Sequence, residues 1–141
     1  MRGDVTGILT ARFLDADAVV TPVSSNSALE KSDWFGRVLR TRIGSPYVIE
    51  GMQQMLADGA TRVVGYEANG GFLTMTAIDD EGRRLPALPT RDAAIVALAI
   101  ILFARRNGTA VSQLASLLPR RFMASDRLRD FPSEVSARRI A

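Results

Sequence analysis

The stretch ATRVVGYEANGGFLTMTAI, residues 60–78, contains two apolar runs separated by a short polar and glycine-rich segment. Asn69-Gly70 lies inside that segment, and Asn-Gly between two apolar runs is a strong short-range signal for a β-hairpin. Glycines there supply the positive φ angles that other residues disfavour. The segment is also too short for the crossover that parallel strands require. We therefore predict strands at 60–67 and 71–78 that pair antiparallel.

Strands and helices alternate along the rest of the chain. The spacing of apolar residues and of turn signals predicts two more strands and five helices, namely strands 16–23 and 36–43 and helices 3–14, 25–35, 45–59, 91–106 and 109–119, with residues 79–90 as a loop. Such alternation is typical of a parallel sheet between helices. We expect an α/β fold: a three-layer α/β/α domain with a four-stranded mixed sheet, whose last two strands form an antiparallel hairpin.

The helix predicted at 91–106 contains the longest apolar block, AAIVALAIILFA at 93–104. This block is too short to cross a bilayer, which needs about 20 residues, so we predict a buried helix capped by Thr90. Ser45 is expected to cap the helix at 45–59. Charged residues interrupt the apolar positions near the N-terminus, and we therefore expect a cytoplasmic protein with no membrane partner.

Composition narrows the chemistry that the chain can perform. Its 141 residues, 47% of them hydrophobic and 23% charged, fit one domain of common size with a real core. The chain has no cysteine and no histidine, which excludes disulfides, thiolate zinc sites and histidine-based catalytic triads. Any proton transfer would depend on Asp, Glu, Lys or Tyr.

Positive charge gathers near the C-terminus, where residues 101–141 hold eight arginines and three acidic residues. A nucleic-acid-binding protein can have such a tail. However, Asp126, Asp130 and Glu134 interrupt the arginines, and no aromatic stacking motif accompanies them. We interpret the tail as a solvated face or a linker and expect no nucleic-acid partner.

Polar residues lie at or just after the ends of three of the predicted strands. Glu67 ends the third strand, Ser24 follows the first, Arg42 lies near the end of the second and Ser45 follows it. Open α/β sheets bind ligands at the carboxyl edge of their strands, and a helix that begins there attracts anions. Each signal has a plainer interpretation, since Ser45 is a common cap and Glu67 could simply flank a hairpin turn. Together they indicate a site for a polar ligand, with an anion as one option.

Four segments resemble a known family in their order and spacing: RTRIGSPYVIEGM (40–52), GYEANGGF (65–72), PTRDAAIVALAI (89–100) and SDRLRDFPSEVS (125–136). They are similar to the third, sugar-recognition domain of phosphohexomutases, the phosphomannomutase/phosphoglucomutase family. The resemblance implies a third-domain-like unit at 1–121 and a linker at 122–141 that leads toward an absent fourth domain. It also implies the strand order 2-1-3-4.

The resemblance assigns substrate-binding roles to residues of this sequence. Glu67 matches the glutamate of the family's GEMSGH-like loop, Asn69 takes the place of its serine, and Gly71 stands where many members have histidine. Ser45 stands where others have the histidine of a TGH motif, and Ser24 replaces a lysine. With Arg42 from the same sheet edge, these residues form the expected substrate-binding set, and no catalytic or metal-binding residue is expected among them.

The family's phosphoserine motif and its DGDGDR magnesium loop have no counterpart here, and DADA at 15–18 lacks that pattern. The resemblance thus implies a fragment, inactive alone, of an enzyme that interconverts hexose 6-phosphate and hexose 1-phosphate. Its Mg²⁺ would bind outside this chain. Its partners would be the other domains of the enzyme and mannose or glucose 1- or 6-phosphate, with a bisphosphate intermediate. The alternative is a free-standing α/β binding or interaction module with a basic C-terminal tail.

Overall fold

The computed structural model describes residues 1–80, 82–124 and 130–140. Its main sheet contains four strands, β1 (Ala18–Pro22), β2 (Arg37–Thr41), β3 (Val63–Tyr66) and β4 (Phe72–Thr74). They lie in the order β2-β1-β3-β4, and β1 runs parallel to both of its neighbours. β4 pairs antiparallel with β3. The predicted mixed sheet, its strand order and its hairpin are confirmed.

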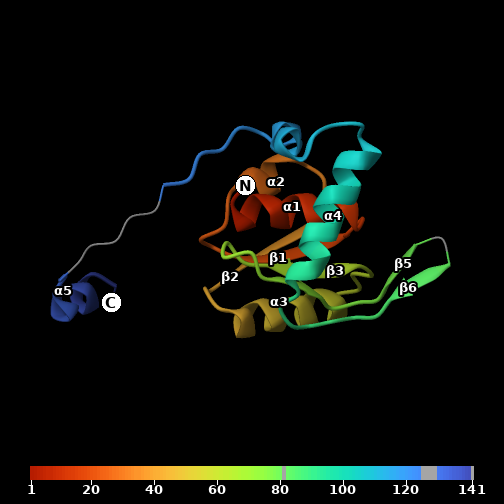
Figure 1. Ribbon diagram of the computed structural model, residues 1–141. Helices are drawn as coiled ribbons and strands as arrows, with labels where there is room; N and C mark the ends of the chain where they lie inside the picture. Colours follow the sequence, from red (N-terminus) through yellow and green to blue (C-terminus); the bar gives the residue numbers. More distant parts are fainter. Residues whose placement is uncertain (81, 125–129, 141) are drawn as a thin grey trace.

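Helices cover both faces of this sheet, which confirms the three layers (Figure 1). One face carries α1 (Gly3–Phe13), α2 (Ala28–Lys31), α4 (Ala93–Arg106) and the 3₁₀ helix η1 (Val111–Leu117). The other face carries α3 (Ser45–Ala57). α2 and η1 differ from the predictions, because only four residues of 25–35 form a helix and 109–119 forms a 3₁₀ rather than an α-helix.

β1, β3 and β4 are mostly apolar because both of their faces are buried, whereas the edge strand β2 contains two arginines and is only partly buried. Successive residues alternate between the layers: Val19 packs toward α1 and α4, and Val20 packs toward α3. Tyr66 and Phe72 fill the first layer, whereas Met52 of α3 lies in the second. The sheet thus separates two apolar clusters, and the loops at its carboxyl edge rest on a core packed from both sides.

A second hairpin lies where the sequence predicted only a loop. β5 (Ile78–Asp80) pairs antiparallel with β6 (Arg83–Leu85), and Gly82 in its turn has φ +78°. The predicted strand 71–78 is correspondingly shorter, since β4 ends at Thr74. After β6 the chain returns to β4, where Leu88 exchanges backbone hydrogen bonds with Thr74. This return brings the start of α4 to the edge of the sheet.

α4 is less buried than predicted. Ala99, Ile100 and Ala104 pack into the core, but Leu98 and Ile101 on its outer side are 60% and 57% exposed. The long apolar block misled the prediction because its composition is apolar around the whole helix. Among the described residues no single helix is long and apolar enough to cross a membrane. Taken together, α4 and η1 have sufficient length and apolar composition, but the pair is bent by 81°.

The cap of α4 also differs from the prediction. Asp92, not Thr90, precedes the helix, and its side chain accepts hydrogen bonds from the backbone N–H groups of Ala94 and Ile95. Asp92 donates its own backbone N–H to the carbonyl of Phe72 at 2.9 Å. The start of α4 is therefore joined to β4 through a backbone contact.

A further helix, α5 (Ser133–Ile140), lies inside the segment predicted as a linker. It lies apart from the sheet and its helices (Figure 1), and Phe131 just before it is 48% exposed. Part of the SDRLRDFPSEVS motif, residues 125–129, lies outside the described residues. The division into 1–121 and 122–141 stays a prediction.

Candidate functional site

Glu67 is the first residue after β3 and begins the turn that leads to β4. Its carbonyl accepts the backbone N–H of Gly70 at 3.0 Å, and its own N–H donates to the carbonyl of Gly71 at 2.9 Å. Gly70 has φ +97°, as expected for the last residue of a three-residue hairpin loop. Asn69 braces the turn, because its Oδ1 accepts the backbone N–H of Gly71 at 3.0 Å. The backbone fixes where the Glu67 side chain begins.

The carboxylate of Glu67 is buried and paired. Only 5% of the residue is exposed, and Ser45 Oγ donates a hydrogen bond to its Oε2 at 2.7 Å. Arg91 donates to the same oxygen through Nε at 3.2 Å and Nη2 at 2.9 Å. A buried carboxylate is costly unless charged or polar groups compensate it. Glu67 therefore joins three segments of the chain instead of merely flanking a turn.

Arg91 was not singled out by the sequence reasoning, although it lies in the segment PTRDAAIVALAI. The chain places it next to Glu67 because Asp92, the following residue, pairs with β4. Gly71 makes room for it, since a Cβ there would lie 3.2 Å from Arg91 Cγ. The sequence feature that could have pointed to Arg91 was its place directly before the helix cap, Asp92. The return of this segment to β4 was not visible in the sequence.

Ser45 has a different role from the cap that was predicted. Gly44 is the N-cap residue of α3, and Ser45 is the first residue of the helix itself. Its hydroxyl donates across to Glu67, while Gly44 adopts φ +129°. Because Gly44 occupies the N-cap position, the Ser45 hydroxyl is free to contact Glu67 at the end of β3.

Arg42 and Ser24 lie on the same sheet edge but do not join this cluster in the described residues. The guanidinium of Arg42 stacks on the ring of Tyr47 at 4.2 Å from its centroid, and the Arg42 residue is exposed. Ser24 is exposed in the loop after β1. The structure thus brings Ser45 and Glu67 into contact and keeps Asn69 and Gly71 on the same turn. Arg42 and Ser24 lie along the edge beside them.

Asp4 of α1, which is completely buried, holds the loop after β1 in place. Asp4 Oδ2 accepts the backbone N–H of Asn26 at 3.1 Å. The Asn26 side chain in turn accepts the N–H of Ala28 and donates to the carbonyl of Arg121. Ser25 is also buried, with its hydroxyl 2.7 Å from that of Thr21. These polar residues hold the loop in place and leave only its outer residues exposed.

Arg40 of β2 holds the same loop from the side. Its Nη1 donates to the carbonyls of Pro22 and Ser25, each at 2.9 Å. It also pairs with Glu30, and the hydrogen bond from Arg40 is the main reason why the pKa of Glu30 is lowered. The edge that carries Ser24 is therefore ordered by contacts within the chain.

The residues of this site do not fit a magnesium ion. In the described part of the chain, no three Asp or Glu side chains lie close enough to hold a metal together. Glu67 Oε2 is surrounded by a hydroxyl and a guanidinium, whose positive charge would repel a divalent cation. Ser45 and Arg91 are suited instead to orient the Glu67 carboxylate, which can then accept hydrogen bonds from other donors.

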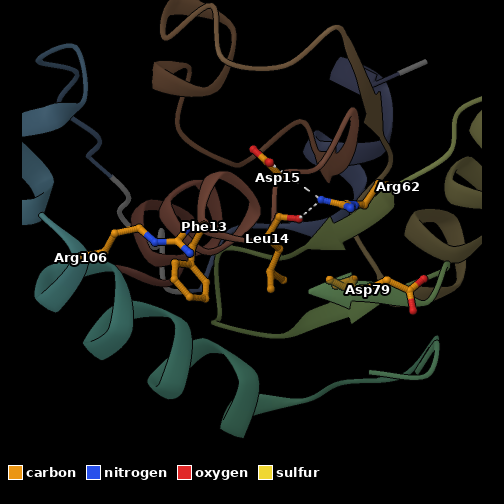
Figure 2. Close-up of a pocket in the computed structure, with 7 residues that line it drawn as sticks. Phe13, Leu14, Asp15, Arg62, Asp79 and Arg106 are labelled. Atoms are coloured by element: carbon orange, nitrogen blue, oxygen red, sulfur yellow. Dashed lines mark hydrogen bonds and ion pairs between the residues drawn. The ribbon is translucent and has the colours of Figure 1, made fainter. Parts of the chain in front are cut away.

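A small hollow lies at the opposite edge of the sheet, near the amino ends of β1 and β3 (Figure 2). Arg62 borders it and donates to the carbonyl of Leu14 at 3.2 Å, with Asp15 at 3.9 Å. Its volume of about 80 Å³ accommodates only a few water molecules. It is too small for a sugar and lies away from Glu67.

Comparison with known proteins connects this geometry to a family. The family model described as phosphoglucomutase/phosphomannomutase, alpha/beta/alpha domain III, matches residues 2–122. A phosphomannomutase of Sinorhizobium fredii NGR234 is 38% identical over 141 residues, which are 100% of this chain and 30% of that protein. A phosphomannomutase of Salmonella muenchen is 42% identical over 136 residues, or 96% of this chain and 28% of that protein. The chain thus spans about 30% of the length of these curated relatives.

Solved structures share the fold at lower sequence identity. A variant of Aspergillus fumigatus N-acetylphosphoglucosamine mutase, in complex with glucose 1,6-bisphosphate, superposes with a TM-score of 0.62 at 13% identity. The match covers 83% of this chain and 28% of that one. An N-acetylglucosamine-phosphate mutase in its substrate complex gives a TM-score of 0.59 at 16% identity, over 84% and 28%. With its α/β/α layers, its β2-β1-β3-β4 sheet and a family match across most of its length, the chain belongs to the phosphoglucomutase/phosphomannomutase family as its domain III.

Proposed function

We propose that this chain is the sugar-recognition domain of a phosphomannomutase-type enzyme, which interconverts hexose 6-phosphate and hexose 1-phosphate. The observation that carries the proposal is the Glu67 carboxylate at the carboxyl edge of the sheet, held by Ser45 and Arg91. Carboxylates accept hydrogen bonds from sugar hydroxyls, and charged acceptors make the stronger ones. The named relatives, both phosphomannomutases, support the choice of substrate class.

In this proposal the chain binds and orients the sugar but does not react with it. Glu67 and Asn69 face the hydroxyls of the hexose, and Gly71 contributes by letting the Arg91 side chain pack against the turn beside them. Arg42, Ser24 and Ser45 line the same edge, where the N-terminus of α3 favours an anion. Holding a substrate in the productive orientation contributes to rate by lowering the entropic barrier.

Phosphoryl transfer also needs a nucleophile and positive charge around the moving group. We assign both, with the Mg²⁺ ion, to other domains of the enzyme, and no step described for this chain uses the metal. The proposed partners are those domains and mannose or glucose 1- or 6-phosphate, with a hexose bisphosphate as intermediate. The structural neighbour in complex with glucose 1,6-bisphosphate supports the bisphosphate. A cytoplasmic location, with no nucleic-acid or membrane partner, completes the proposal.

The test is a pair of variants in a full-length phosphomannomutase that carries this domain. Glu67→Gln keeps the shape and removes the charge, which should lower kcat/KM by about ten- to a hundredfold, as for a charged hydrogen bond of about 1.5–3 kcal/mol. Asn69→Ala should cost less, about fivefold for roughly 1 kcal/mol. Wild-type kinetics for Glu67→Gln would reduce the loop to a simple hairpin turn. The 141 residues alone should give no turnover of mannose 1-phosphate.

A further inference from the structure

We propose that Arg91 is a positioning residue, which orients the Glu67 carboxylate so that Oε1 is the oxygen offered to a sugar hydroxyl. The inference rests on the proposed function and extends it to a residue that the sequence reasoning did not select. Arg91 and Ser45 supply three hydrogen bonds to Glu67, and all three end on Oε2. No hydrogen bond to Oε1 is formed within the part of the chain that the structure describes.

One oxygen is thus saturated and the other remains an acceptor. A carboxylate has about four lone-pair sites, and Oε2 already has three donors, so a further donor has room only at Oε1. The Glu67 side chain is 6% exposed. A ligand can therefore reach the carboxylate only through this small exposed part, which restricts its direction of approach.

Arg91 is held firmly enough to orient the Glu67 carboxylate, although its own side chain is 58% exposed. Its neighbour Asp92 donates to the carbonyl of Phe72 and caps α4, so the backbone at Arg91 is fixed between β4 and the helix. The methylene chain lies against Gly71. Surface ion pairs contribute little by themselves, but this one ends on a buried carboxylate through two nitrogen atoms of the guanidinium.

A direct role is the competing interpretation, in which the guanidinium itself binds the phosphate of the ligand. The two roles differ in what they require. A phosphate contact needs the phosphate and is independent of the charge on Glu67. A positioning role affects a neutral sugar as strongly as a phosphorylated one and acts only through Glu67.

The experiment measures binding to the 141-residue chain by NMR titration with mannose 1-phosphate and with methyl α-mannoside. The variants are Arg91→Gln, Arg91→Lys, Glu67→Gln and the double variant Arg91→Gln/Glu67→Gln. Arg84→Gln is the matched control, because Arg84 is 71% exposed on the β5–β6 hairpin and loses the same charge. Far-UV circular dichroism and a thermal melt check that each variant folds.

We expect Arg91→Gln to weaken both ligands by the same factor, about three- to tenfold, and Arg91→Lys to recover part of the loss. In the Glu67→Gln background the Arg91 change should have almost no further effect, and Arg84→Gln should bind like the wild type. Should Arg91→Gln fail to fold, Arg91→Lys carries the same cycle with Glu67→Gln.

Three results would overturn the inference. A loss confined to mannose 1-phosphate would show a direct phosphate contact, and additive effects in the double variant would show that Arg91 acts independently of Glu67. Wild-type affinity in Arg91→Gln would remove its role while leaving the proposed function intact. If the wild-type chain binds neither ligand, the proposed function fails, and the inference fails with it.

Discussion

The backbone of Gly71 lies directly against the side chain of Arg91, such that a Cβ on Gly71 would come within 3.2 Å of Cγ and 3.4 Å of Cδ. The family resemblance places Gly71 where many members have a histidine. In this chain the missing side chain is matched by the arginine that covers the same turn. The two residues therefore act together, and a change at one should be felt at the other.

Gly71→Ala tests this dependence. The added Cβ would crowd Arg91 and also Asn69 Oδ1, at 3.3 Å, by a few tenths of an ångström, and the exposed arginine can move away at little cost in stability. We expect the melting temperature to change little and the affinity for mannose 1-phosphate to fall about two- to fivefold, because the Arg91 contact with Glu67 is displaced. Gly70→Ala is the contrasting variant, since φ +97° strains any Cβ and should cost about 1 kcal/mol of stability. Equal effects of the two variants on melting and binding would contradict this explanation.

Gly3→Ala should be more damaging than either. A Cβ at Gly3, the first residue of α1, would lie 2.3 Å from the backbone nitrogen of Gly70 and 2.6 Å from the carbonyl oxygen of Ala68. Backbone atoms of a hydrogen-bonded turn cannot yield as a side chain can. We expect a loss of about 1–3 kcal/mol in the free energy of unfolding, measured by urea denaturation, and displaced Glu67-loop resonances. A wild-type midpoint would show that α1 does not support the loop.

The hairpin could be predicted from the sequence because its signals are local: Asn69 and Gly70 lie between two apolar runs. The sheet order came from the family resemblance, and the alternation of elements supported its parallel part. Arg91 could not be found this way, because its contact with Glu67 depends on Leu88 and Asp92 returning to β4 after an unexpected hairpin. Pairing between distant segments leaves no short-range pattern.

The predictions for Ser45 and for α4 were wrong for the same reason, because contacts between distant segments decided both. Ser45 precedes a proline at a helix start and looks like a cap, yet its hydroxyl bonds to Glu67, 22 residues away. The composition of α4 predicted complete burial, whereas Leu98 and Ile101 are exposed. Composition reports how apolar a helix is, but which of its sides meets the core is decided by the elements packed against it.

Substitutions on α4 should reflect this division. Leu98→Gln replaces a residue that is 60% exposed, and we expect the free energy of unfolding to stay within about 0.5 kcal/mol of the wild-type value. Ile100→Ala is the control on the buried side, where 6% exposure predicts a loss of about 2–4 kcal/mol. Urea denaturation of both variants provides the comparison. A large loss for Leu98→Gln would mean that another surface covers this side of the helix in solution.

Asp17 should stabilise the fold in a pH-dependent way. Its carboxylate accepts hydrogen bonds from the backbone and hydroxyl of Thr61 and from the backbone of Arg62, at 2.8–2.9 Å. Burial raises the pKa of Asp17, but these hydrogen bonds outweigh burial and lower it. Because the folded-state pKa is lowered, the contribution is present above about pH 4 and is lost as the pH falls through the folded-state value.

We expect Asp17→Asn to cost about 1 kcal/mol at pH 7 and progressively less below about pH 4, measured by denaturation across pH. The exposed neighbour Asp15 provides the control variant Asp15→Asn, which should change stability by less than about 0.5 kcal/mol. A cost for Asp17→Asn that stays constant down to pH 2 would contradict the assignment.

Tyr66 predicts the opposite behaviour at alkaline pH. It is completely buried, and within the described residues its hydroxyl has no hydrogen-bond partner. Burial raises the pKa of Tyr66. The unfolded chain loses this proton near pH 10, whereas the folded chain keeps it, so stability should fall as the pH rises above about 10. Tyr66→Phe removes both the buried hydroxyl and this titration.

We therefore expect Tyr66→Phe to be as stable as the wild type at pH 7, or more stable by up to about 2 kcal/mol, because an unpaired buried hydroxyl costs free energy. Above about pH 10 its advantage should grow by roughly 1.4 kcal/mol for each pH unit until the folded protein also ionises. Tyr47→Phe controls for the loss of a tyrosine, since Tyr47 lies partly exposed under Arg42. The measurement is the denaturation midpoint of the wild type and of both variants at pH 7 and pH 10.5. A less stable Tyr66→Phe at neutral pH would mean that the hydroxyl has a partner, such as a buried water molecule, that stabilises the fold.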